Sequence, residues 1–453
     1  MDKFYDICII GGGPCGLSCA IHVALKGFAT AIVEVGNAYS KRWCSADNGW
    51  ECVNCKTCHV ISGFGGCVHF GDSAKLSYYP SGKKLYDKLG SDYQRILEMA
   101  CNIWDVDCER DFIRNKIDGS GFGIEIKDYP VCVLNSKKIE KRLQWMHQQI
   151  SKNNVDIYNC MMIDYQYQGD GFCVELGVDY HIKCKKLVLA MGRAGRNWLK
   201  KNIHVKELQH EAPISTYGLR FEMPKSYLID IGMMHPDFKA RTVYNNIKYK
   251  SFCYCGGQNG GRLKFINYGD YILLDGHVLT ETDIDVGYGN FALLRQTNSS
   301  MNEGRSNLQS INDILDRYKC ISGGRPIYQD YYSFKNNKDS RPTNNISAAC
   351  VKPGAVYKLF NTIADKDEFC IVAEKILSFI ANKNSISLEE LLLSVTVIGL
   401  ELEGLWDRIE TDEKFMTHIS GLYVGGDCGG ETQGILQATM MGIKIAEAIT
   451  ATS

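Results

Sequence analysis

The chain has 453 residues, enough for two or three domains or for one large domain with an insertion. Hydrophobic residues make up 45% and charged residues 23%, which is typical of a globular protein rather than a disordered or fibrous one. The formal net charge of −1 gives no electrostatic basis for binding nucleic acid or an anionic membrane surface.

The first apolar run, FYDICIIGGGPCGLSCAIHVALKGF, fits neither a signal peptide nor a membrane anchor, because Asp6, the Gly-Gly-Gly-Pro break and His22 interrupt it. No later window offers about 20 uninterrupted apolar residues. We therefore expect a cytoplasmic protein without a membrane span. The 20 cysteines are spread through a long chain, so we expect most of them to be reduced thiols, many packed as small hydrophobic residues.

Residues 5–10, YDICII, have the pattern of a buried parallel strand, and LSCAIHVALKG has that of a helix. Gly11, Gly13 and Gly16 place a G-x-G-x-x-G pattern between them. The first glycine permits a tight turn, the second lets a pyrophosphate approach, and the third lets helix and strand pack closely. The next strand, FATAIVE, ends at Glu34, where an acidic side chain takes ribose hydroxyls. The sequence therefore predicts a dinucleotide site.

The segment that follows, residues 43–67 (WCSADNGWECVNCKTCHVISGFGGC), is rich in cysteine. Cys52, Cys55 and Cys58 have C-x-x-C-x-x-C spacing, and Cys44 or Cys67 can supply a fourth thiolate. Three interpretations stay open. The cysteines hold an iron–sulfur cluster or zinc, with Cys44, Cys52, Cys55 and Cys58 as the ligands; or they form a redox thiol pair that exchanges electrons with the cofactor; or they pack as reduced thiols along the cofactor pocket.

The middle of the chain mixes helix and strand patterns. Residues 136–154 predict a helix with Ser136 as its N-cap and Ile139, Leu143 and Met146 on its buried face. Residues 197–395 have the pattern of a separate α+β substrate or cap domain, with strand-like runs such as YLIDIGMM and DYILLDGHVLT. No second strand–G-x-G-x-x-G–helix unit is found, so we expect no separate NAD(P)H domain.

Two later segments bear on the identity of the dinucleotide. Residues 183–195, KCKKLVLAMGRAG, predict a strand that leads into Gly192, and residues 419–449 predict a strand ending near Asp427 and a helix starting near Gly434. An aspartate next to a helix N-terminus suits hydrogen bonds to a ribityl hydroxyl and a pyrophosphate. The helix dipole can also stabilise negative charge on a reduced flavin ring.

The order of these motifs resembles that of FAD-binding oxidoreductases with a glutathione-reductase-like FAD domain, in which the first and last segments clasp one FAD. The resemblance implies an α/β fold: a discontinuous Rossmann-like FAD-binding domain (1–196 and 396–453) with an inserted substrate or cap domain (197–395). The FAD contacts that we expect on this basis are Gly11, Gly13, Pro14, Gly16, Glu34, Arg42, Gly192, Asp427, Gly434 and Ile435.

Most of the chain also resembles a bacterial group of uncharacterised FAD-dependent dehydrogenases. The resemblance is carried by CVNCKTCHVISGFGGCVHFGDSAKL, YGLRFEMP, SFCYCGG, DGHV, NFALL, VIGLELEGLW and GDCGGETQGILQA, in that order. The chain departs from this group at Cys67 and His69, where small residues are usual, and at Gly71, where serine is usual. The resemblance indicates the fold and the cofactor but says little about the substrate.

In this fold the segment after the ribose-binding acid passes along FAD towards the isoalloxazine ring, so we expect the glycines of GFGGCVHFGDSAKL (63–76) near it. His69, Asp72 and Lys75 are the candidates for catalysis. His69 suits a general acid or base, and Lys75 beside the flavin could stabilise the anionic reduced ring. The alternatives are a core histidine, a turn-capping aspartate and a solvated lysine.

The function expected from these observations is that of an FAD-dependent oxidoreductase. It would transfer a hydride to or from a small organic substrate at a C–C or C–N bond, with NAD(P)H or a protein as electron partner. A flavin monooxygenase is one alternative, although its usual G-D-A-A-H is GDCGGE here. Electron exchange through the cysteine-rich loop is another, and a non-catalytic redox sensor is an alternative of a different class.

Overall fold

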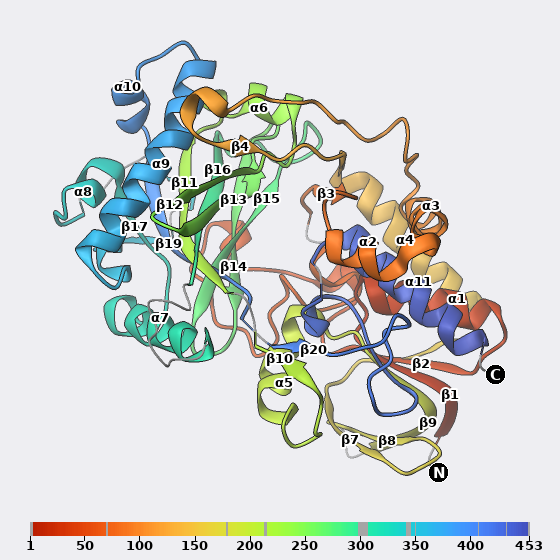
Figure 1. The fold of residues 1–453 in the computed structure, drawn as a ribbon. Coiled ribbons are helices and arrows are strands. Elements are labelled where there is room, and N and C mark those ends of the chain that lie inside the picture. Colours follow the sequence, from red (N-terminus) through yellow and green to blue (C-terminus); the bar gives the residue numbers. More distant parts are fainter. Residues whose placement is uncertain are drawn as a thin grey trace.

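The computed structural model describes residues 3–68, 71–177, 180–212, 215–297, 307–340, 346–348, 350–405, 407–431 and 433–451. The fold is mixed α/β and contains two main sheets, which lie on opposite sides of Figure 1. Among the described residues, no helix is both long enough and apolar enough to cross a membrane.

The first sheet has the order β6-β2-β1-β9-β8-β7, with β21 also paired to β9. Its strands are β1 (Lys3–Ile10), β2 (Thr30–Val33), β6 (Asp156–Tyr158), β7 (Met162–Tyr167), β8 (Phe172–Leu176), β9 (Tyr180–Leu189) and β21 (Leu422–Val424). The pairs β1–β2, β1–β9, β2–β6 and β9–β21 are parallel, whereas β7–β8 and β8–β9 are antiparallel. A parallel β1-α1-β2 unit with a returning β21 is the Rossmann-like arrangement expected from the sequence.

The helices α1, α3, α4 and α11 lie together beside the first sheet (Figure 1) and share one hydrophobic core with it. Their bounds are α1 (Pro14–Leu25), α3 (Tyr93–Trp104), α4 (Ser136–Lys152) and α11 (Ile435–Ala451). In α4, Ile139, Leu143 and Met146 are buried as predicted. The predicted N-cap was wrong by one residue: Asn135 caps the helix by accepting the N–H of Lys138, and Ser136 is the first helical residue.

The second sheet has the order β18-β17-β19-β11-β16-β13-β12-β4. Its strands are β4 (Glu125–Ile126), β11 (Thr216–Pro224), β12 (Ala240–Tyr244), β13 (Ile247–Cys255), β16 (Tyr288–Gln296), β17 (Ile327–Asp330), β18 (Lys352–Pro353) and β19 (Thr396–Glu403). Helix α9 (Ile363–Lys383) covers it, and Phe369 of that helix stacks on Phe221 of β11. Residue 396 was expected to begin the returning FAD-binding segment, but β19 is hydrogen-bonded to β11 and β17 within the second sheet.

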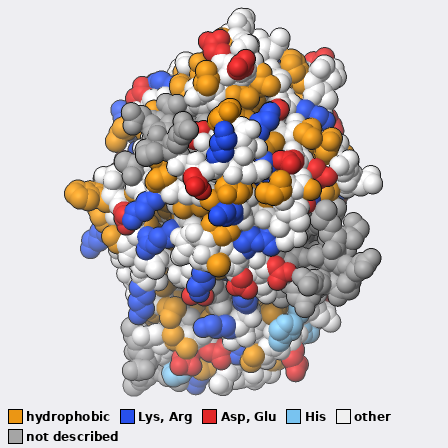
Figure 2. All heavy atoms as spheres, turned by 90° about the vertical axis from the view of Figure 1, so that its left-hand side faces the viewer, with side chains coloured by type: hydrophobic (Ala, Val, Ile, Leu, Met, Phe, Trp, Pro, Cys, Tyr) orange, Lys and Arg blue, Asp and Glu red, His pale blue; other side chains and the backbone are white. Residues whose placement is uncertain are grey.

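The remaining elements connect or flank the two sheets. They are α2 (Lys83–Leu89), α5 (Arg196–Asn202), α6 (Ile229–Met234), α7 (Asn307–Ser322), α8 (Tyr331–Lys335), α10 (Leu388–Leu392), β3 (Ala74–Ser77), β5 (Val131–Leu134), β10 (His210–Glu211), β14 (Gly261–Asn267), β15 (Ile272–Val278) and β20 (Arg408–Ile409). The run DYILLDGHVLT contains strand β15 as expected, whereas the end of YLIDIGMM forms α6 instead of a strand. On the face shown in Figure 2, positive, negative and hydrophobic side chains are interspersed.

Candidate FAD and substrate site

The glycine turn follows β1 and leads into α1, as the sequence predicts. Gly11 has φ +113°, and a Cβ there would lie 2.3 Å from the carbonyl oxygen of Ala190. A Cβ on Gly16 would lie 1.9 Å from the oxygen of Gly11, so helix and strand pack too closely for any side chain. Gly13 is different: a Cβ there would meet only Gly66, at 3.8 Å. The turn is therefore tight at its first and third glycines and open at its second.

The carboxylate of Glu34 joins three segments of backbone. It accepts the N–H of Gly12 at 2.6 Å, that of Gly36 at 2.7 Å and that of Gly63 at 2.8 Å. Glu34 is 8% exposed and lines the cavity described below. One side chain thus fixes the glycine turn, the residues after β2 and the end of the cysteine-rich loop, and it still faces the cavity.

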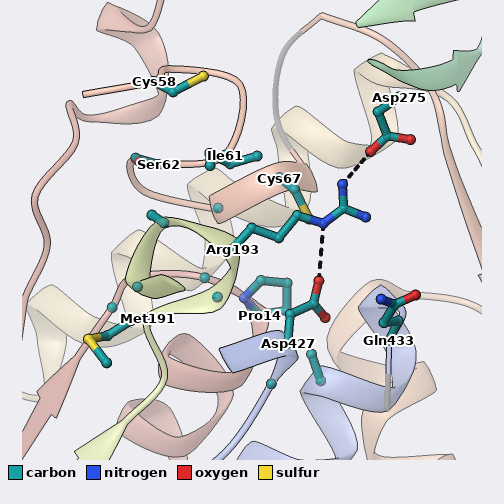
Figure 3. Close-up of a pocket in the computed structure, with 18 of the residues that line it drawn as sticks. Pro14, Cys58, Ile61, Ser62, Cys67, Met191, Arg193, Asp275, Asp427 and Gln433 are labelled. Carbon is teal, nitrogen blue, oxygen red and sulfur yellow. Dashed lines mark hydrogen bonds and ion pairs between the residues drawn. The ribbon is translucent and has the colours of Figure 1, made fainter. Parts of the chain in front are cut away.

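The opposite wall comes from the far end of the chain. Asp427 follows β21, and Gly434 and Ile435 stand at the start of α11. Figure 3 shows Arg193 between two carboxylates: it contacts Asp427 at 3.4 Å and Asp275 at 2.6 Å. Arg193 comes from the turn after β9 and Asp275 from β15, so this bridge connects the first sheet to the β14–β15 hairpin.

These walls enclose a cavity of about 1160 Å³. Its lining includes most of the FAD contacts expected from the sequence, namely Gly11, Gly13, Pro14, Glu34, Gly192, Asp427, Gly434 and Ile435. It continues past β13 and β15, where Lys250, Cys253 and His277 line it. The residues present fit FAD: the cavity is large, two long helices begin at its wall, and the glycine turn leaves open space where a side chain would obstruct a pyrophosphate.

Two of the expected FAD contacts do not line the cavity. Gly16 lies behind the turn and serves the packing of α1 on β1. Arg42 donates to the carbonyl oxygens of His59, Val60 and Phe64, and burial lowers the pKa of Arg42 to about 10. Arg42 therefore holds the shape of the cysteine-rich loop, which in turn forms part of the cavity wall.

The cysteine-rich loop lies along the cavity, but its thiols are dispersed. Cys55, Cys58 and Cys67 line the cavity, whereas Cys44 is buried. Within the described part of the chain, no three His, Cys, Asp or Glu side chains form a group able to hold a metal ion, so Cys44, Cys52, Cys55 and Cys58 are not brought together as ligands. Burial raises the pKa of Cys44 to about 11 and also raises the pKa values of Cys52 and Cys58, which favours the protonated thiols.

Of the three catalytic candidates, His69 lies outside the described residues. Asp72 is buried, with Lys264 at 2.6 Å, His277 at 3.4 Å and Arg262 at 3.6 Å. Burial opposes the charge of Asp72, but its contacts with these three residues, Lys264 most strongly, hold its pKa well below the usual range. Asp72 does not reach the cavity itself, but His277 does.

Lys75 lines the cavity and contacts Asp237 at 2.9 Å and the carbonyl oxygen of Tyr254 at 2.7 Å. Burial opposes its charge, but Asp237 outweighs burial and raises the pKa of Lys75. Asp237 also accepts the hydroxyl of Tyr129 at 2.6 Å, and despite burial its pKa falls to about 2, with Lys75 as the main cause. The pair is therefore fully charged at neutral pH.

Sequence reasoning missed Arg193, Asp237 and His277 as cavity residues. It expected the turn-rich stretch 251–262, which contains Cys253, to line the site, and Cys253 does line the cavity. His277 lies in the segment DGHV, which carried part of the family resemblance without suggesting a role. Arg193 and Asp237 had no local signal, because their partners lie 82 and 162 residues away along the chain.

Comparison with known proteins bears on the part of the chain that contains the glycine turn and Glu34. Residues 5–211 match the family described as pyridine nucleotide-disulphide oxidoreductase. An uncharacterised protein of Clostridium beijerinckii is 22% identical to this chain. The aligned region covers 97% of this chain and 80% of that protein.

Solved structures that resemble the chain share little sequence with it. A geranylgeranyl bacteriochlorophyll reductase-like protein of Thermoplasma acidophilum is 13% identical, with a TM-score of 0.43 over 100% of this chain and 79% of that one. The 2,6-dihydroxypyridine-3-hydroxylase of Arthrobacter nicotinovorans is 10% identical, with a TM-score of 0.43 over 100% and 85%. The family match and the cavity together identify the part of the chain around the first sheet as a Rossmann-like FAD-binding domain.

Proposed function

We propose that the protein transfers a hydride between FAD and a small organic anion, at a C–C or C–N bond of that substrate. FAD would be clasped by the first and last segments of the chain, as in the glutathione-reductase-like arrangement. When bound, it supplies the two-electron chemistry. The observation that supports the proposal most directly is a cluster of lysines on the same cavity as the FAD-binding segments.

The lysine cluster consists of Lys75, Lys127, Lys239 and Lys250, all of which line the cavity. Lys75 is paired with Asp237, and Lys250 contacts Glu403 at 2.7 Å. Neither Lys127 nor Lys239 forms an ion pair with a carboxylate of the described residues. Burial lowers the pKa of Lys127 to about 8, with Lys239 as a further cause, and burial also lowers the pKa of Lys239. Positive charge therefore exceeds negative charge at this end of the cavity, and a carboxylate or phosphate would compensate it.

His277 is the residue best placed to carry a proton for this reaction. Its Nδ1 lies 3.4 Å from Oδ2 of the buried Asp72. Its ring lines the cavity, where an imidazole can serve as a general acid or base. Asp72 thus acts as a positioning residue through His277, in place of the direct catalytic role expected from the sequence.

Anaerobic turnover of the FAD-loaded protein with matched substrate pairs tests the proposal. Each small carboxylic or phosphorylated compound is compared with its neutral amide or ester, and bleaching of the oxidised flavin is followed. The reverse direction is assayed after reduction with dithionite or NAD(P)H. We expect turnover with anionic members only, a higher KM in Lys239→Gln, and a lower kcat with an altered pH profile in His277→Gln. Lys83→Gln on the surface is the control; equal turnover of neutral and anionic partners would refute the anionic substrate.

A further inference from the structure

The segment SFCYCGG places two cysteines close together on the cavity wall. In a regular strand, residues two apart are separated by about 6.6 Å along the strand. In β13, however, Phe252 pairs with Ala292 and Cys255 pairs with Asn290, so one extra residue is inserted opposite β16. Cys253 lies in this β-bulge with φ +46°, a conformation that is costly for a residue with a side chain. The bulge brings the two sulfur atoms to 3.7 Å.

The two thiols have different surroundings. Cys253 lines the cavity, whereas Cys255 is fully buried. The ammonium of Lys75 lies 3.9 Å from the sulfur of Cys253, and the guanidinium of Arg220 lies 3.5 Å from its carbonyl oxygen. The carbonyl oxygen of Gly276, 3.0 Å from the same sulfur, favours the protonated form and is opposed by the Lys75 ammonium. The Cys255 thiol can donate to the carbonyl oxygen of Cys253 at 3.1 Å.

These contacts set the protonation of the pair. The hydrogen bond with Cys255 is the largest cause that lowers the pKa of Cys253; burial and Asp275 oppose it, whereas Lys75 and Arg220 add to it. Burial is the main cause that raises the pKa of Cys255. The negative charge of the pair is therefore favoured on Cys253, which lines the cavity, and the proton on Cys255, which is the division found in reactive dithiols.

We propose that Cys253 and Cys255 form a redox dithiol that reacts with low-molecular-mass disulfides entering the cavity. The Cys253 thiolate attacks one sulfur of the disulfide, forms a mixed disulfide and releases the first thiolate. Cys255 then loses its proton to that departing thiolate and attacks the Cys253 sulfur, which releases the second thiolate. The net change converts the Cys253 thiolate, the Cys255 thiol and one small disulfide to a Cys253–Cys255 disulfide, one small thiol and one small thiolate, with two electrons passing to the substrate.

This activity does not depend on the hydride transfer proposed above. The two sulfur atoms would move from 3.7 Å to the bonded distance of about 2.05 Å. The proposal also differs from redox chemistry at the C-x-x-C-x-x-C loop, because Cys52 and Cys58 remain protonated at neutral pH.

The first test is alkylation of the FAD-loaded protein with iodoacetamide at about pH 6, read by mass spectrometry of tryptic peptides. Residues 251–262 form one tryptic peptide that contains only these two cysteines. We expect Cys253 to be alkylated roughly 10-fold faster than Cys58, because a greater thiolate fraction outweighs the lower nucleophilicity of a low-pKa thiolate. Equal rates at Cys253 and Cys58 would overturn the thiolate assignment.

The second test exposes the same protein to oxidised glutathione under anaerobic conditions. The wild-type peptide should lose two hydrogen atoms, Cys255→Ser should stop at a glutathione adduct on Cys253, and Cys320→Ser, at an exposed cysteine outside the cavity, should behave like wild type. A persistent adduct in the wild type would refute the resolving role of Cys255. Lys75→Gln keeps both cysteines but removes the cation beside Cys253, so less thiolate should be present at low pH. Alkylation of Cys253 should therefore slow at about pH 6 and recover at about pH 10. An unchanged rate at about pH 6 would refute the role of Lys75.

Discussion

Glu34 offers the sharpest test of how the FAD-binding domain holds FAD. Its Oε1 accepts two N–H groups, from Gly36 and Gly63, while Oε2 accepts one from Gly12. In Glu34→Gln the amide oxygen can replace Oε1, but the amide nitrogen then faces the Gly12 N–H and cannot accept it. A lost charge-assisted hydrogen bond costs about 1.5–3 kcal/mol, and we expect this loss in the free energy of unfolding of the FAD-free protein.

The same substitution should weaken FAD binding separately, because a neutral amide is a poorer acceptor for a ribose hydroxyl than a carboxylate. Loss of a second bond of that strength raises the Kd roughly 10- to 100-fold. Urea unfolding measures the first effect, and titration with FAD followed by flavin fluorescence measures the second. The control is Glu98→Gln on the exposed side of α3, which should change neither. If Glu34→Gln binds FAD as tightly as wild type, the ribose-binding role of the carboxylate is refuted.

Three further substitutions test other parts of the argument. Arg193→Gln leaves two carboxylates without their shared cation and should lower the free energy of unfolding by about 3 kcal/mol. The control, Arg95→Gln in a surface ion pair, should lower it by less than about 1 kcal/mol. The midpoints of urea unfolding distinguish the two variants. Asn135→Ala should lower the free energy of unfolding by about 1 kcal/mol and Ser136→Ala by much less. The reverse order would support Ser136 as the N-cap, which is the residue expected from the sequence. Because the pKa of Cys253 is lower in the folded chain than in the unfolded one, Cys253 should make stability rise with pH below about 8.5, the usual pKa of cysteine. In Cys253→Ser this rise should be smaller by up to about 1.4 kcal/mol per pH unit, and an identical pH dependence would contradict the lowered pKa.

The FAD-binding unit could be predicted because its signals are local. The turn from Gly11 to Gly16 lies within one strand–turn–helix, and Glu34 directly follows the next strand, so spacing alone places them together. The returning strand and the helix from Ile435 were recognised in the same way. Each of these elements is specified by contacts over short stretches of chain, which is the information that hydrophobic periodicity and glycine positions carry.

The substrate end could not be predicted in the same way, because its residues meet only through long-range pairing. Asp72 was singled out for its place after a glycine run, yet its role depends on Lys264 and His277, which come from the β14–β15 hairpin about 200 residues later. The bulge at Cys253 exists only because β13 pairs out of register with β16. Nothing in the segment SFCYCGG alone distinguishes a bulged pair of thiols from two buried core cysteines.

The charged residues between the two sheets explain why both ends of the cavity are held in one arrangement. Arg193 pairs with Asp427 of the FAD-binding unit and with Asp275 of the hairpin, and Asp275 lies 3.9 Å from Arg220 on β11. Arg220 is fully buried and donates to Glu401 of β19 at 3.0 Å. Buried charges are costly unless each keeps its partners, so a shift of the hairpin relative to either sheet would leave at least one of them unpaired. This requirement favours a single placement of the lysine side of the cavity against the FAD-binding side, which is the geometric condition for the proposed hydride transfer.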